Sequence, residues 1–258
     1  MKKLNQYIQE KFELNKNTKV IYKYFPITKE ELRKILEERL KKDKNANLND
    51  IDVSRLDDLN GIFNQLDPCD IDISHWDVSK VTDMSFMFYN CKNFNCNLSK
   101  WDVSNVENME YIFCNCENFD ASCLESWEPK NIDDLEYAFS GIKKFNADLS
   151  KWKTNKVENM IYTFKNCEEF TGKGLENWNM SKVKGTVGML YNCKNFNINV
   201  GNWKLDKVEH SQFMFYGCKS FLGKGLEKWD LNNKAIHQVN MFDSTPIEKN
   251  LPKWYMTK

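Results

Sequence analysis

The chain has 258 residues, with 37 Lys and Arg side chains against 37 Asp and Glu, 41% hydrophobic residues, 10 Gly and 5 Pro. A hydrophobic fraction near that of globular proteins, together with few Gly and Pro, excludes collagen-like and low-complexity classes. Because a chain of this length buries a substantial core, no disulfide, metal ion or other cofactor is needed to explain its stability.

Charge is segregated along the chain. Residues 1–50 carry a net charge of +5, residues 51–150 carry −12, and residues 151–258 carry +7. The basic excess that a nucleic-acid-binding domain shows as a whole is absent, which argues against nucleic acid as a partner. The basic last hundred residues leave open a contact with an anionic polymer, with a solvated lysine-rich surface as the alternative.

The sequence predicts no membrane insertion. The first 25 residues lack the apolar run of a signal peptide, no stretch of 18 apolar residues occurs, and residues 251–258 carry neither a hydrophobic tail nor a lipidation motif. Nine Cys, an odd number in a chain too large to need cross-links, favour reduced thiols. As written, the sequence therefore indicates a cytoplasmic protein.

The first 47 residues predict a helix-strand-helix cap. Residues 4–14 can form an amphipathic helix, and residues 19–25 resemble a strand that Pro26 ends. Thr28 is an N-cap candidate with Glu31 three residues later, and a helix from there to about Asp43 has an apolar face. That face consists of Leu32, Ile35, Leu36 and Leu40, with Ile27 placed to contact Leu32. Such a cap covers the open end of a repeat array, and a partner-binding helix is the alternative.

A repeat fills the remainder, residues 48–258. The eight Trp recur at alternating intervals of 25 and 26 residues, at Trp76, Trp101, Trp127, Trp152, Trp178, Trp203, Trp229 and Trp254. A first copy without Trp begins at Ile51, and in the last copy Phe242 follows Trp229 by thirteen residues instead of twelve. A period of this length predicts about eight stacked coils with a degenerate C-terminal cap.

The repeated unit reads W-D-V-S-x-V-x-x-M-x-x-M-F-x-x-C-x-x-F-N-x-x-L-S-x. Its Trp-x-Val step has the period of a strand, and the apolar positions from Val81 to Cys91 have the period of a short helix. We therefore predict an α/β repeat solenoid with one short strand and one short helix per coil, and an N-terminal α-helical cap. In the longer copies, glycines at 172, 174, 223 and 225 can absorb the additional residue in a tight bend.

Cysteine recurs fifteen residues after Trp, and Ile142 replaces it once. The column contains Cys91, Cys116, Cys167, Cys193 and Cys218. Replacement by Ile favours packing over metal binding, and the spacing lacks the paired C-x-x-C of a zinc site. No metal site is predicted.

The unit F-N-x-x-L-S-x-W-D-V-S-x-V-x-x-M-x-x-M-F-x-x-C-x-x-F at residues 94–119 resembles the repeat of the BspA-like leucine-rich-repeat surface proteins, also called the DUF285 family. Its M-F-x-x-C-x-x-F core is similar to the A-F-x-x-C-x-x-L core of treponemal leucine-rich repeats. The resemblance covers about residues 51–254. It implies a leucine-rich-repeat-like right-handed solenoid that binds proteins, in many members for adhesion or display at the cell surface, without catalytic residues.

The candidate binding residues flank the Trp column, where a rigid frame would present variable side chains outward. Directly after Trp come Asp77, Asp102, Glu128, Lys153, Asn179, Lys204 and Asp230, and directly before it come Lys100, Lys151 and Lys228 among other polar residues. Solvated spacers are the alternative for any one of them. The expected function is a protein-recognition scaffold of the adhesion or surface-interaction type; an intracellular scaffold, a self-associating solenoid and an anionic-polymer binder stay open.

Catalysis has little support in the sequence. The three histidines, His75, His210 and His237, lie in different repeats and lack the neighbours of a catalytic triad. The Gly-Lys-Gly segments at 172–174 and 223–225 lack the frame of a phosphate-binding loop. We therefore expect a non-enzymatic protein with a protein partner.

Overall fold

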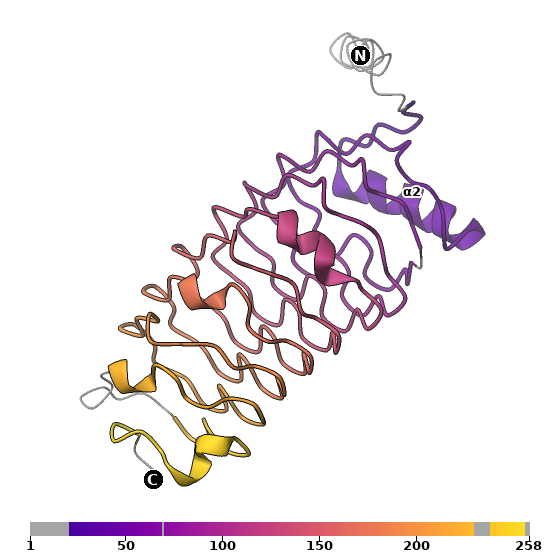
Figure 1. Ribbon diagram of the computed structural model, residues 1–258. Coiled ribbons are helices and arrows are strands. Elements are labelled where there is room, and N and C mark those ends of the chain that lie inside the picture. The colour runs from indigo at the N-terminus through magenta and orange to yellow at the C-terminus, as the bar shows by residue number, and fades with distance from the viewer. Residues whose placement is uncertain (1–20, 69, 230–237, 256–258) are drawn as a thin grey trace.

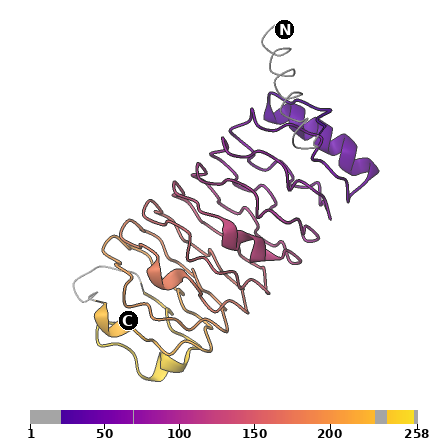
Figure 2. The ribbon, with the colours of Figure 1, turned by 45° about the horizontal axis from the view of Figure 1, so that its top comes forward.

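The computed structural model describes residues 21–68, 70–229 and 238–255. Successive turns of the chain stack into an elongated body, with the first and last described residues at opposite ends (Figures 1 and 2). We call each turn a coil and number its positions from its Trp, or from Ile51 in the first coil, so that position +7 lies seven residues later. The predicted helix at 4–14 and the candidate binding residue Asp230 lie outside the described residues.

Helix α2 (Lys29–Lys42) covers the first coil, as the sequence predicts. The Thr28 side chain accepts a hydrogen bond from the Glu31 amide, and the Glu31 carboxylate accepts one at 2.8 Å from the amide of Ile27, the residue before the N-cap, in a variant of the capping box. Leu32, Leu36 and Leu40 are buried in the same hydrophobic cluster as the coils, and Ile35 packs against it. The strand predicted at 19–25 is wrong for its described part, where Tyr24 forms one isolated bridge to Ile51.

Isolated parallel bridges connect one coil to the next. They join residues at position +7 through seven coils: Asp58, Asp83, Asn108, Asp134, Asn159, Gly185 and His210. Amides at positions +8, +10, +12 and +14 donate to carbonyls of the next coil, as Phe86 does to Glu110 and Asn90 to Cys114. The backbone of each coil is thus held by its neighbours.

The predicted α/β solenoid, with a strand and a helix in each coil, is wrong. In the described residues the coils contain no multi-residue strand, and α2 is the one α-helix. From Val81 to Cys91 the chain makes successive turns, closed for example by the Met87 amide on the Met84 carbonyl at 3.2 Å. Helix is prevented because alternate amides bond the next coil and because Phe86 and Asn90 have φ angles of 55° and 60°.

The three 26-residue coils each contain a short 3-10 helix before the next Trp. These are η1 (Ala121–Ser126), η2 (Leu175–Asn177) and η3 (Leu226–Lys228), which lie along one side of the stack (Figures 1 and 2). Gly174 and Gly225 precede η2 and η3 with φ angles of 94° and 95°. The predicted glycine bends are confirmed in these two coils, whereas η1 in the first 26-residue coil follows Asp120 without a glycine.

The core consists of columns of identical or similar side chains. All eight Trp are at most 5% exposed, and each indole Nε1 donates to a backbone carbonyl 28 or 29 residues earlier in the chain, as Trp101 does to Ile73 at 3.1 Å. The rings from Trp101 to Trp178 stack in series, with centroids 6.4 Å apart for Trp101 and Trp127, and those from Trp203 to Trp254 do the same. The predicted Trp ladder inside the stack is confirmed.

The ends of the stack are closed by charged side chains. At the N-terminal end the Arg33 Nη1 donates to the carbonyls of Ile62 at 3.0 Å and Asn64 at 2.7 Å, at positions +11 and +13. In later coils the carbonyls at these positions accept hydrogen bonds from amides of the preceding coil. The first coil has no preceding coil, and Arg33 supplies the donors instead. At the other end the carboxylate of Glu248, in η4 (Pro246–Lys249), accepts from the Ser244 amide at 3.0 Å.

Candidate functional site

The sequence-predicted columns beside Trp lie at the surface. Each described member is exposed: Asp77, Asp102, Glu128, Lys153, Asn179, Lys204, Lys100, Lys151 and Lys228. Their role in binding stays a prediction. Some have a local structural role, because the carboxylates of Asp77 and Asp102 accept hydrogen bonds from the amides two residues later. Hydrogen bonds from Ser104 lower the pKa of Asp102.

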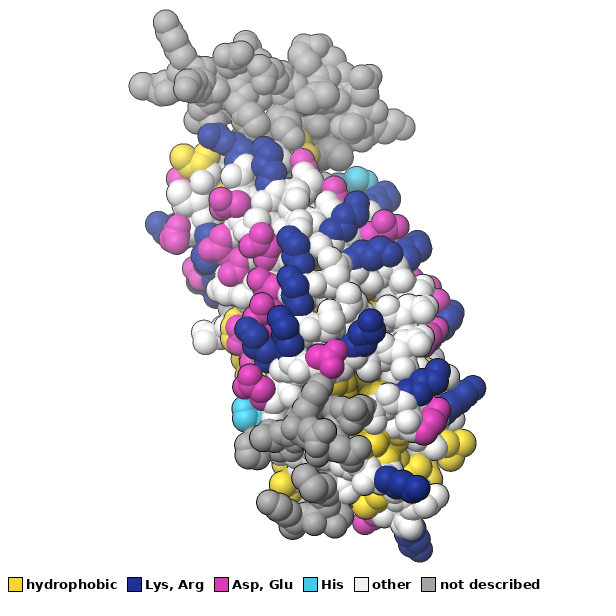
Figure 3. All heavy atoms as spheres, turned by 90° about the vertical axis from the view of Figure 1, so that its left-hand side faces the viewer, with side chains coloured by type: hydrophobic (Ala, Val, Ile, Leu, Met, Phe, Trp, Pro, Cys, Tyr) yellow, Lys and Arg dark blue, Asp and Glu magenta, His cyan; other side chains and the backbone are white. Residues whose placement is uncertain are grey.

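A second surface brings together acidic residues from positions +6, +7 and +9. Bridges join the coils at +7, and at +6 each amide donates to the carbonyl of the preceding coil, as in Asp133 to Glu107 at 2.8 Å. We call this surface the acidic edge; it contains Asp57, Asp58, Asp83, Glu107, Glu110, Asp133, Asp134, Glu136 and Glu158. Figure 3 shows carboxylate side chains gathered in a band along the stack, with lysine side chains beside it.

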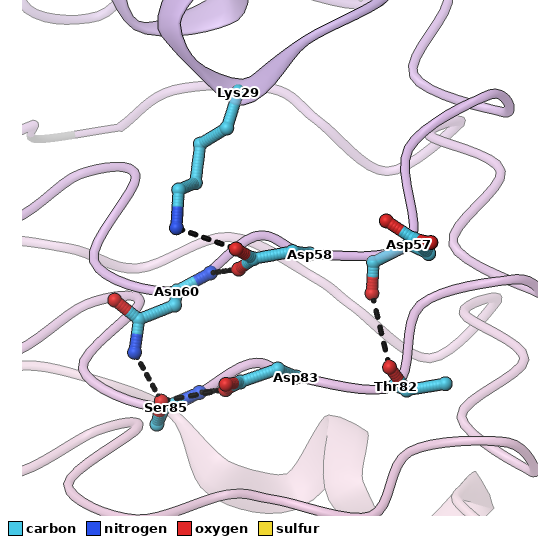
Figure 4. Close-up of polar contacts among 7 residues, drawn as sticks. All are labelled: Lys29, Asp57, Asp58, Asn60, Thr82, Asp83 and Ser85. Atoms are coloured by element: carbon cyan, nitrogen blue, oxygen red, sulfur yellow. Dashed lines mark hydrogen bonds and ion pairs between the residues drawn. The ribbon is translucent and has the colours of Figure 1, made fainter.

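Two of the protein's own lysines bind the ends of the acidic edge. At the first coil the Lys29 Nζ lies 2.6 Å from the Asp58 Oδ2, so that α2 is attached to the edge (Figure 4). Towards the C-terminus Lys184 forms an ion pair with Glu158. Between them, within the described part of the chain, no ion pair is found for Asp83, Glu107, Glu110, Asp133, Asp134 or Glu136.

The middle of the acidic edge is electrostatically strained. Burial and the neighbouring carboxylates of Asp134, Glu136 and Asp83 raise the pKa of Glu110. Burial, together with the nearby carboxylates of Asp134, Glu107 and Glu158, likewise raises the pKa of Asp133. Hydrogen bonds from the Asn159 side chain reach Asp134 and Glu136 but add no positive charge. The edge therefore has negative charge that the described residues do not neutralise.

An aromatic ladder adjoins the acidic edge. Four aromatic residues occupy position +10 and are partly exposed: Phe86, Tyr111, Tyr137 and Tyr162. The first two pairs of rings stack with centroid distances of 4.8 and 4.6 Å, and the third pair is tilted at 4.9 Å. All four have positive φ angles of 51–55°, a conformation that costs about 1 kcal/mol or more in a residue other than glycine. Stacking contributes a similar amount for each pair. Burial, Tyr137 and nearby carboxylates raise the pKa of Tyr111 to about 12.

The aromatic ladder already contacts one ammonium group. The Lys165 Nζ lies 4.7 Å from the ring centroid of Tyr162 and 5.8 Å from that of Tyr137, within the range of cation-π attraction. Lys165 occupies position +13, where earlier coils have Ser140 and Cys114. The surface beside the acidic edge is therefore compatible with cationic side chains.

A shallow groove of about 470 Å³ lies at the C-terminal part of the acidic edge. Asp133, Asp134 and Glu158 line it together with Asn159, Lys184 and His210, and Ile161 and Gly185 are also exposed to it. Gly185 stands at position +7, where earlier coils have Asp or Asn. The missing side chain at this one coil opens the groove beside Ile161, whose Cδ1 is 3.0 Å from where a Cβ would stand.

The cysteine column is structural. Cys116, Cys167, Cys193 and Cys218 are buried, and their thiols donate to carbonyls of the preceding coil at 3.0–3.1 Å. Burial raises the pKa of each of these thiols. The described part of the chain contains no cluster of His, Cys, Asp and Glu suited to a metal ion. Cys69 and His237 lie outside the described residues.

Sequence reasoning missed the acidic edge and the aromatic ladder. The charge of −12 on residues 51–150 was the available signal for the edge. The residues at +7 differ in type from coil to coil, so they do not stand out as a motif, and their adjacency depends on the stacking register. The residues at +10 did not stand out because they do not belong to the apolar spacing on which the helical prediction depends.

These features define a repeat protein with a uniform interior and a varied exterior. The chain belongs to the DUF285 family. The family model, which is described as Mycoplasma protein of unknown function, DUF285, matches residues 30–152 and 133–254. No curated protein and no solved structure matches the chain. Among the described residues, no helix is long and apolar enough to cross a membrane.

Proposed function

We propose that the protein is a non-enzymatic protein-recognition scaffold of the BspA-like surface-protein type, acting in adhesion or in another surface interaction. The observation that carries this proposal is the contrast between inside and outside of the coils. Buried Trp, Phe and Cys recur in column after column, whereas the exposed residue after Trp changes from Asp102 to Glu128, Lys153 and Asn179. A regular frame that presents varied side chains suits recognition through many contacts.

Family membership supports the same proposal, because the motif by which the chain resembles BspA-like surface proteins lies within the matched range. A long exposed surface with two charged regions offers the specificity that protein interfaces obtain from electrostatic complementarity. Self-association is a second candidate, favoured by the opposite net charges of residues 51–150 and 151–258. Sedimentation velocity distinguishes it: a self-associating chain sediments faster at low than at high salt, and a monomer at both salt concentrations contradicts it.

Affinity capture tests the scaffold proposal. The native protein, the variant Lys153→Glu/Lys204→Glu and the control Lys143→Glu/Lys219→Glu serve as baits for whole-cell and cell-surface extracts. All four lysines are exposed, and both variants make the same change in net charge. We expect quantitative mass spectrometry to find at least one protein that the native and control baits retain and the column variant loses. Identical sets from all three baits, or no retained protein, contradict recognition through the Trp-flanking columns.

A further inference from the structure

We propose that the acidic edge and the groove at Gly185 bind a lysine- or arginine-rich segment of a partner protein in an extended conformation. The inference rests on the proposed function, because it names the class of partner that the scaffold recognises. It assigns this role to a different surface from the Trp-flanking columns.

Charge complementarity is the first argument. The middle coils place Asp83, Glu107, Glu110, Asp133, Asp134 and Glu136 on one surface without a pairing cation among the described residues. Carboxylates that repel one another gain the most from a bound cation, because it removes repulsion as well as adding attraction.

The fold itself shows which ligand chemistry the edge accepts. The ammonium of Lys29 binds Asp58 at the first coil, and that of Lys184 binds Glu158 at the fifth. Lys165, in the same coil as Glu158, lies over the last two rings of the aromatic ladder. Three lysines of the chain thus occupy the edge and the adjoining ladder at their limits, and the coils between them present the same groups without a lysine.

The groove supplies a place for one side chain of the ligand. Ile161 offers apolar surface to the methylene groups of a lysine or arginine, and Asp133 and Asp134 stand where its charged end would lie, beside the Glu158 that Lys184 already binds. Long basic side chains combine an apolar stem and a charged head in this way. No ion pair of the Asp133 carboxylate is found within the described part of the chain.

The dimensions suit a short extended segment. From the coil of Asp83 to that of Gly185 there are four steps between coils, which span about 20 Å at the usual spacing of paired backbones. An extended peptide covers this distance with about six residues. The ligand is therefore a short basic stretch that runs along the stack rather than a folded domain.

The chain offers variants with a structural precedent. Asn108 and Asn159 already occupy position +7, where their side chains accept the amide two residues later, as Asp134 does. Asp133→Asn/Asp134→Asn therefore removes two charges from the groove and keeps this turn. Gly185→Asn restores the column's usual residue and fills the groove without changing the charge. Asp77→Asn/Asp102→Asn removes two charges beside Trp, where Asn179 provides the precedent.

Fluorescence anisotropy with a labelled peptide of alternating lysine and serine tests the proposal, with a glutamate-serine peptide as the charge control. We expect Asp133→Asn/Asp134→Asn to weaken binding of the lysine peptide about tenfold, which corresponds to about 1.4 kcal/mol. Gly185→Asn is expected to weaken it severalfold, and Asp77→Asn/Asp102→Asn by less than about twofold. Binding should weaken as the salt concentration is raised.

Three outcomes overturn the proposal: the lysine peptide fails to bind at low salt, both charge-removing variants weaken binding equally, or Gly185→Asn leaves the affinity unchanged. Equal weakening indicates a diffuse attraction to net charge instead of the groove. None of these outcomes decides the scaffold proposal, which the capture experiment tests with lysines on another surface. Conversely, a failed capture with Lys153→Glu/Lys204→Glu leaves the peptide measurement valid.

Discussion

Each tryptophan connects two coils through one polar atom and a large apolar surface. The indole N–H of Trp203, for example, bonds the Leu175 carbonyl at 2.8 Å while the ring is 3% exposed. A phenylalanine would fill much of the space but would lose this hydrogen bond, which leaves the buried Leu175 carbonyl with the Trp178 amide as its donor and costs about 0.5–1.5 kcal/mol. The need for an apolar ring with one donor explains why Trp recurs in this column.

Substitutions at two glycines distinguish the effect of backbone conformation on stability from the effect of close packing. Gly174 and Gly61 have φ angles of 94° and 60°, but a Cβ at Gly174 would stand 2.3 Å from the Ser150 nitrogen, whereas the nearest atom at Gly61 is 3.9 Å away. Gly61→Ala should lower the free energy of unfolding by about 1 kcal/mol, because residues other than glycine take the same conformation at position +10 of later coils. Gly174→Ala should cost about 2–5 kcal/mol, because backbone atoms must move as well. Urea unfolding measures both, and equal losses would show that the close approach does not matter.

At the scale of the element, α2 stabilises the stack by replacing a missing coil. The Arg33 guanidinium supplies donors to carbonyls at +11 and +13, and Leu32 and Leu36 cover the apolar end of the first coil. Glu248 does the complementary task at the other end, where an amide lacks its acceptor. The two ends differ because each coil donates hydrogen bonds to the next one. The carbonyls of the first coil therefore lack donors, and the amides of the last coil lack acceptors.

Arg33→Met should lower the free energy of unfolding by about 1.5–3 kcal/mol, because its hydrogen bonds to partly buried carbonyls carry a charge. Lys34→Met, at the next and exposed position of the same helix, should change it by less than about 0.5 kcal/mol. Urea unfolding followed by tryptophan fluorescence compares the two variants. A similar effect of both would mean that Arg33 contributes only its net charge.

Local signals made α2 predictable, and non-local ones concealed the conformation of the coils. Thr28, Glu31 and the spacing of leucines determine a helix within a few residues. From Val81 to Cys91 the apolar spacing is also nearly helical, but alternate amides bond the next coil about 25 residues away. The buried columns of Trp, Phe and Cys were predictable because the repeat marks them. The acidic edge was not, because Asp134 and Asn159 become neighbours only through the stacking register.

At the scale of the whole molecule, charge segregation concentrates repulsion in the middle coils. Because the pKa of Glu110 is raised in the folded protein, its ionised form destabilises the fold above that pKa, and this effect disappears as the pH falls through it. Glu110→Gln should therefore raise stability at pH 7 by about 0.5 kcal/mol, and by progressively less on acidification. Glu128→Gln, at an exposed position, is the control for the loss of one negative charge. Urea midpoints measured across the pH range distinguish the two, and a loss of stability in Glu110→Gln at pH 7 would contradict the repulsion.

The alternation of short and long coils makes the pair, not the single coil, the unit that can be removed. In the native stack the bend at Gly174 of a long coil lies against Leu149 and Ser150 of the preceding short coil, and Gly225 lies against Gly201 in the same way. Deleting residues 127–177 removes one short and one long coil and leaves every remaining long coil beside a short one. Deleting residues 127–151 removes only a short coil and places the bend at Gly174 against η1.

Because the stability of stacked repeats is approximately a sum of repeat and interface terms, the larger deletion should lower the urea midpoint modestly and keep one cooperative transition. The smaller deletion should lower it more, although it removes fewer residues, since it creates an interface between two long coils that cannot approach as closely. Circular dichroism and tryptophan fluorescence during urea unfolding provide the comparison. A higher stability of the variant lacking residues 127–151 would contradict this expectation. It would mean that a long coil packs equally well against a short or a long neighbour, and that the single coil is the unit of the fold.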